Sequence, residues 1–138
     1  MHKNEKGFSL IELIVVMTIV AVITVIGVVS FSAAGVKSRD GRRMADLSKI
    51  QVALELYRQA YGSYPQSVSV VANLVPTYLQ AWPTDPKGSG FATYSYVSSG
   101  NPAFSYSLMA YMEDTSTYNV NTGYQCGTNM CNYVVVNP

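Results

Sequence analysis

The sequence predicts an α+β protein in which a long amino-terminal helix, transmembrane in its first half, packs by its second half on a small antiparallel sheet. The segment from Leu13 to Val36 has 24 residues and no charge, and an amphipathic pattern follows at residues 37–61. Short alternating segments separated by glycine and proline fill the remainder, as is typical of antiparallel strands. A helix followed by hairpin-like strands indicates the α+β class.

The uncharged segment is long enough to cross a membrane. As a helix, 24 residues extend about 36 Å, and the hydrocarbon core of a bilayer is roughly 30 Å thick. Its many valines and isoleucines do not favour a strand there, because in lipid the backbone must satisfy its own hydrogen bonds. Glu12 stands at the start of this segment, where a carboxylate is costly and by default has a functional role.

Apolar side chains at spacings of three and four predict that the helix continues to Tyr61. The stripe consists of Met44, Leu47, Ile50, Leu54, Tyr57 and Tyr61. Most charged side chains of this stretch, Arg43 among them, are expected to lie off the stripe. Gly62 and Pro65 then supply a helix stop, so one helix from Phe8 to Tyr61 would be about 81 Å long.

After this stop the chain predicts a short helix and three strands. The helix is expected at residues 70–74, and turn-forming residues follow at 82–90. Alternation predicts strands at residues 93–97, 104–112 and 133–136, of which the second is the clearest. This small sheet is expected to cover the carboxyl half of the long helix.

The predicted head is nearly uncharged beyond its helix. The whole chain carries a net charge of +1, yet the charged residues after position 65 are only Asp85, Lys87, Glu113 and Asp114. Eight of the eleven tyrosines lie between residues 78 and 133. Because tyrosine combines apolar area with a polar tip, these residues suit either a contact surface or the faces of a small sheet.

Two cysteines, Cys126 and Cys131, stand near the end of the chain. A zinc site needs more ligands than two thiols, and no histidine follows His2. A disulfide would close a short loop and place the head in an oxidising compartment. Two unpaired thiols are the alternative.

A specific pattern marks the start of the chain. A short charged leader ends in Gly7, Phe8 follows, and Glu12 is the fifth residue after the glycine. This pattern ahead of an apolar helix resembles the processing site of the type IV pilins and of the pseudopilins of type II secretion. The resemblance is strong over residues 7–36 and weaker beyond.

The resemblance implies a leader at residues 1–7, a transmembrane or fibre-core helix at 8–36, and a periplasmic or extracellular pilin head at 37–138. A prepilin peptidase would cut between Gly7 and Phe8 and methylate the new amino group of Phe8. The subunit would wait in the cytoplasmic membrane as a single-pass protein, with its amino terminus in the cytoplasm. An inner-membrane assembly platform would then add it to a helical fibre of copies and other pilins.

Glu12 is expected to drive assembly in such a fibre. It lies about one helical turn from Phe8, and both the carboxylate and the new amino group would be poorly solvated near lipid. In a fibre, Glu12 of one subunit could meet the amino group of Phe8 on another. The alternative is a solvated acid that merely favours the helix dipole.

The cofactor prediction is that there is none, with calcium left as an alternative. Residues 45–65, with Asp85 and Pro86 after them, are similar to the major pseudopilins, which often bind calcium in their last loops. Here Asp85, Glu113 and Asp114 are the only acids after Glu55, whereas calcium takes six to eight oxygen ligands. The sequence therefore predicts no metal site.

Nucleic acid is a partner that the sequence allows without indicating it. A run of basic residues contains Arg39, Arg42 and Arg43, and such a run can contact phosphates. It abuts the apolar segment and is expected to lie along the helix instead. The mature chain has no histidine and no acid pair beside a binding motif, so we expect no enzymatic activity.

Other interpretations of the amino-terminal segment stay open. It could be a secretory signal cut after Ala34, a plain membrane anchor, or a buried core helix. The positive-inside rule also opposes the expected topology, because four basic residues at positions 37–43 follow the segment and only Lys3 and Lys6 precede it. We give precedence to the more specific leader pattern. The alternative function is a membrane-anchored extracytoplasmic binding protein that does not polymerise.

Overall fold

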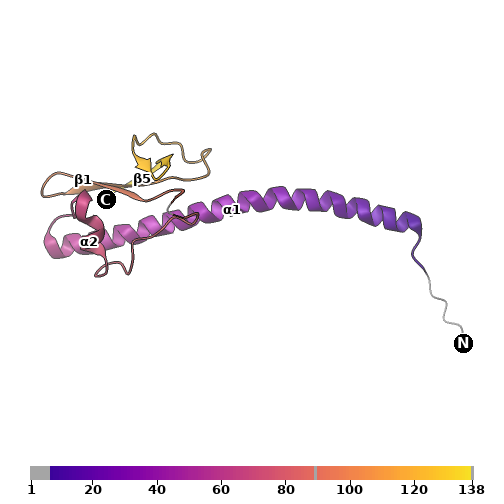
Figure 1. Ribbon diagram of the computed structural model, residues 1–138, viewed down its shortest axis with the longest axis horizontal. Coiled ribbons are helices and arrows are strands. Elements are labelled where there is room, and N and C mark those ends of the chain that lie inside the picture. Colours follow the sequence, from indigo (N-terminus) through magenta and orange to yellow (C-terminus); the bar gives the residue numbers. More distant parts are fainter. Residues whose placement is uncertain (1–6, 89, 138) are drawn as a thin grey trace, which may run out of the picture. The chain divides into compact units, whose positions relative to one another are not determined.

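The computed structural model describes residues 7–88 and 90–137, so six of the seven predicted leader residues lie outside it. The chain divides into two compact units, Met1–Gly35 and Val36–Pro138. The second unit contains all the strands and is called the head below. The predicted fold class is confirmed, because a long amino-terminal helix precedes a small antiparallel sheet (Figure 1).

The helix α1 runs from Leu10 to Tyr61, over 52 residues. It begins two residues later than the sequence predicts, and the Ser9 carbonyl accepts the amide of Leu13 at 3.2 Å in its first turn. It ends where predicted, because Gly62 adopts a φ of 77° and donates its amide to the carbonyl of Arg58 at 2.7 Å. Glycine reaches this left-handed conformation without strain, which makes it a common helix terminator.

The main sheet has three antiparallel strands in the order β1-β2-β5. The strands are β1 (Ser95–Ser99), β2 (Ser105–Ala110) and β5 (Tyr133–Val136). All three strands were predicted, with β1 displaced by two residues. β2 ends earlier than expected because the amide of Met112 donates at 2.6 Å to the side-chain oxygen of Asn132 instead of to a neighbouring strand.

Smaller elements complete the head. The predicted short helix is α2 (Val70–Leu74), and the 3₁₀ turn η1 (Ser67–Ser69) leads into it. A second, two-stranded sheet pairs β3 (Gln125–Cys126) with β4 (Asn129–Met130), and the sequence analysis missed it. Strands of two residues are too short for alternation to be recognised.

The core of the head lies between α1 and the main sheet. The helix contributes Leu47, Ile50 and Leu54 to a cluster that also contains Tyr96, Tyr106 and Leu108 from β1 and β2. The predicted stripe is therefore correct for its central members. Tyr61 is an exception, because its side chain is exposed and stacks on Tyr57 with 4.4 Å between ring centroids.

Candidate functional site

The residues of the leader pattern lie at an exposed chain end. Gly7, Phe8 and Ser9 precede the first turn of α1, and Phe8 is 80% exposed. A side chain at Gly7 would meet no other atom within 4 Å. The fold of the described chain therefore does not require glycine at this position, so a requirement for it would have to come from a partner.

Glu12 lies in the first turn of α1 and is exposed. It is the only charged residue between Gly7 and Val36. Among the described residues its carboxylate has no hydrogen bond and no ion pair. An acid in the first helical turn interacts favourably with the helix dipole, which is worth at most about 1 kcal/mol at an exposed site.

The first unit presents apolar side chains to its surroundings without burying them. The most apolar part of α1 has a mean hydropathy of 2.9 and no buried residue. By length and composition this helix can cross a membrane. The exposed large side chains begin at Phe8 and Leu10 and continue to Ile26 and Phe31.

A buried arginine lies at the centre of an ion cluster in the head. Arg43 is inaccessible to solvent and donates to Asp85 through Nε at 2.6 Å and Nη2 at 2.9 Å. Its Nη1 donates to Asp40 at 2.7 Å and to Glu113 at 2.8 Å. A single guanidinium thus joins the helix to the loops that carry Asp85 and Glu113.

Glu113 is the most heavily paired carboxylate of this cluster. It accepts hydrogen bonds from Arg39 at 2.7 Å on each oxygen, and Lys87 lies 2.8 Å from Oε2. Hydrogen bonds from Arg39, Lys87 and Arg43 outweigh burial and hold the pKa of Glu113 well below its usual range. The negative charge of Glu113 is therefore stabilised throughout the neutral pH range.

The cluster corrects one expectation about charged residues. Arg43 does not lie off the buried face as predicted, and Arg39 is paired, so the basic run does not present three free guanidinium groups to a phosphate backbone. Asp85 and Glu113 are engaged by these cations, and Asp114 accepts from Ser116 and Thr117. Within residues 7–88 and 90–137, no three ligand-type side chains are arranged to hold a metal ion.

The head contains a disulfide between Cys126 and Cys131, as the sequence analysis predicted. Both cysteines are buried and pack with Met109 of β2. The amide of Cys131 donates to the carbonyl of Tyr124 at 2.9 Å. The bridge joins the last residue of β3 to the residue that follows β4, two positions before β5 begins.

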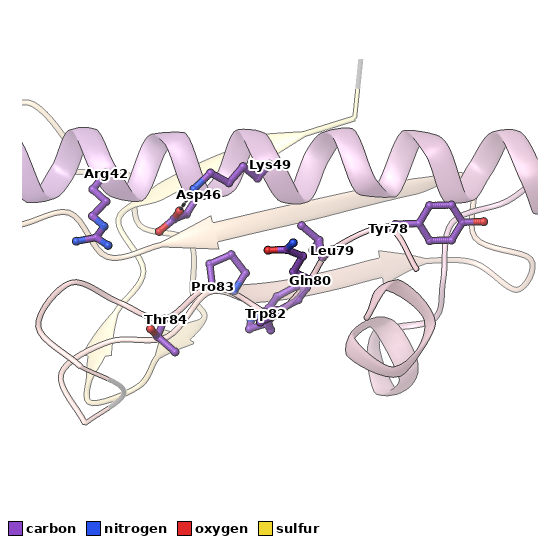
Figure 2. Close-up of a pocket in the computed structure, with 10 residues that line it drawn as sticks. Arg42, Asp46, Lys49, Tyr78, Leu79, Gln80, Trp82, Pro83 and Thr84 are labelled. Carbon is purple, nitrogen blue, oxygen red and sulfur yellow. Dashed lines mark hydrogen bonds and ion pairs between the residues drawn. The ribbon is translucent and has the colours of Figure 1, made fainter. Parts of the chain in front are cut away.

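An open groove of about 530 Å³ lies beside α1 in the head (Figure 2). Arg42, Asp46 and Lys49 project from the helix, and residues 78–84 form the other wall. Asp46 accepts from Lys49 at 2.9 Å and from the hydroxyl of Tyr94 at 3.0 Å, so its charge is satisfied. The described lining offers one exposed cation without an ion-pair partner, Arg42, and no nucleophile beside a general base.

The amino-terminal pattern agrees with a known family. Residues 2–30 match the family described as the prokaryotic N-terminal methylation motif. This motif is the class III signal peptide of type IV pilins and pseudopilins, so it indicates a type IV pilin-like protein that a prepilin peptidase processes. Comparisons with curated proteins and with solved structures found no match.

Proposed function

We propose that this protein is a structural subunit of a type IV pilus or of a pilus-like fibre, such as those of type II secretion or competence. The observation that carries the proposal is the leader pattern at residues 7–12, placed directly before a helix that exposes apolar side chains and a single carboxylate. A surface of this kind needs either lipid or other apolar helices around it. Fibre assembly exchanges the first environment for the second.

Processing at the Gly7–Phe8 bond would prepare the subunit for assembly. The bond lies in an exposed segment outside the helix, where a peptidase can reach the backbone. Cleavage would remove the seven leader residues and create an amino group on Phe8, which the same enzyme would methylate. The pilin-like head would then stand outside the cytoplasmic membrane, where the disulfide can form and persist.

Glu12 would set the axial offset between neighbouring subunits during assembly. A carboxylate and an amino group at 4 Å attract each other by about 4 kcal/mol at an effective dielectric constant of 20, before losses from desolvation. Glu12 has no partner within the described residues of its own chain, so the Phe8 amino group of another copy is an available one. The attraction acts only when two subunits have the correct axial offset.

Two variants test the proposal in the native host. Gly7→Val should leave the full-length chain in the membrane and abolish fibres, whereas the wild-type chain should lose seven residues and gain one methyl group by mass spectrometry. Glu12→Gln should be processed normally and keep a folded head, yet give little or no sheared fibre. A wild-type chain that keeps its leader and never enters a fibre would instead indicate the membrane-anchored binding protein.

A further inference from the structure

The part of α1 that belongs to the head has a solvent-exposed face without charge. Its residues are spaced by three or four, and all are exposed: Gly41, Ala45, Ser48, Val52, Leu56 and Gln59. The charged residues of the same helix, from Arg39 to Arg58, lie at other positions. Because a helix face that meets only water is typically charged or polar, this uncharged face is unusual for a permanently solvated surface.

The carboxyl-terminal part of the uncharged face forms one wall of a groove of about 390 Å³. Val52 is 61% exposed and Leu56 is 45% exposed, and both line the groove. Gln51 and Glu55 of the same helix and Tyr106 of β2 complete most of the lining. The groove therefore combines an apolar wall with hydrogen-bonding groups at its base and rim.

Tyr106 gives the groove an unsatisfied polar group. The residue is 2% exposed, and its hydroxyl has no hydrogen bond of adequate geometry within the described residues. Burial raises the pKa of Tyr106, and the nearby side chain of Gln51 opposes the rise. A buried hydroxyl without a partner is costly, so native structures usually provide one.

Other core tyrosines of the head show how regular such pairing is. The hydroxyl of Tyr64 donates to Glu55 at 2.6 Å, that of Tyr94 to Asp46 at 3.0 Å, and that of Tyr96 to the carbonyl of Pro65 at 2.8 Å. Tyr106 differs from these three in facing a groove that opens beside exposed apolar side chains.

We infer that the uncharged face and its groove form the docking site for the head of a second copy of this chain. The inference rests on the proposed function, because a fibre repeats one contact between copies and needs a surface that neighbouring copies bury. The docked head covers Val52 and Leu56. The contact is heterologous, joining two different surfaces of the same chain, as an open helical filament requires.

The charge of the surface identifies the occupant. A nucleic acid or a strongly charged protein would leave its charges unpaired against this face, because Glu55 is the one charged residue of the described groove lining and already accepts a hydrogen bond from Tyr64. Residues 66–138 of this chain include only four charged side chains, so the part of a second head that follows α1 matches the face. The small residues Gly41, Ala45 and Ser48 also allow the backbone of a neighbour to approach closely.

A charge placed on the face tests the inference in assembled fibres. Val52→Asp should lower the yield of sheared fibres by about tenfold or more, since a buried unpaired carboxylate costs more than the 1.4 kcal/mol that a factor of ten represents. The matched control is Val71→Asp, which changes an apolar residue of α2 that is 45% exposed and lies outside the groove. It should leave the yield unchanged. Wild-type yield for Val52→Asp, or equal losses in both variants, would overturn the inference.

Two further measurements separate effects on folding from effects on assembly and identify the molecule that docks on the face. Val52→Asp changes an exposed residue, so the detergent-solubilised subunit should keep its Tm while its fibres dissociate at a lower temperature. A photoreactive amino acid at position 52 should cross-link to the head of the same chain in fibres. Unchanged fibre stability, or cross-links to a different protein only, would overturn the inference. If the wild-type chain forms no fibre, the proposed function itself fails.

Discussion

The two units of this chain share one helix but obtain their stability from different sources. In the first unit, every residue from Gly7 to Ala34 whose exposure the structure describes is exposed, although the large side chains are apolar. In the head, the same helix buries Leu47, Ile50 and Leu54 against the sheet. The first unit therefore needs lipid or neighbouring copies to cover its apolar side chains, whereas the head has a hydrophobic core of its own.

The largest effect is expected from removing the cation at the centre of the head. Arg43→Met would leave the buried Asp40 and Asp85 and the partly buried Glu113 without their shared partner, and breaking a buried pair costs about 3–5 kcal/mol. Urea unfolding of the detergent-solubilised full chain, followed by near-ultraviolet circular dichroism of the tyrosines, measures the loss. Arg42→Met is the matched control, and it should change the free energy of unfolding by less than about 0.5 kcal/mol. Equal effects of the two substitutions would contradict the role of Arg43.

A charge introduced into the first unit should weaken membrane insertion without changing the stability of the head. Val20→Asp places a carboxylate near the middle of the apolar segment, at a cost of about 2.5–3.5 kcal/mol for insertion. The fraction that resists alkaline carbonate extraction should fall, while the urea midpoint of the head in detergent stays at its wild-type value. A lower midpoint would show that the two units are not independent.

The disulfide should contribute less than the ion cluster. Loop entropy gives about 2 kcal/mol for a cross-link between residues as close in sequence as Cys126 and Cys131. Replacing both cysteines with serine should lower the free energy of unfolding by this amount, without changing membrane extraction. A loss as large as that of Arg43→Met would mean that the bridge, and not the ion cluster, dominates the stability of the head.

The smallest effect is a dependence on pH that is confined to the head. The pKa of Glu113 is lowered on folding, so its contribution is complete above its unfolded pKa of about 4.3 and is lost progressively as the pH falls below that value. The Tm of the wild-type chain should therefore decrease between about pH 5 and about pH 3. In Glu113→Gln the decrease should be shallower. Parallel curves for the two chains would exclude Glu113 as the titrating group.

The sequence predicted most of the fold because its periodicities are long and local. The stripe on α1, the glycine that ends the helix and the alternation in β2 each depend on residues within a few positions of one another. The start of α1 was placed two residues too early, since nothing in the apolar run marks its first hydrogen-bonded turn. The strands β3 and β4 were missed because two residues show no period.

The candidate site was predictable in one unit only. The leader pattern is contiguous, so Gly7, Phe8 and Glu12 could be identified by spacing. The ion cluster joins Arg43 to Asp85 and Glu113, which lie 42 and 70 residues further along the chain, and no local pattern records such a pairing. One signal was available, because residues 37–58 have a surplus of basic side chains and the almost uncharged region after them contains three acids.

Arg43 also affects how the stability of the head depends on dissolved ions. A bound ion stabilises a protein by mass action, so its effect depends on the concentration of that ion in the surrounding solution. A guanidinium that belongs to the chain is always present in one equivalent and cannot be diluted or chelated. Because the pairs of Arg43 are buried, dissolved salt also screens them weakly. The connection between the helix and its two loops should therefore stay constant while the ionic composition of the surrounding solution varies.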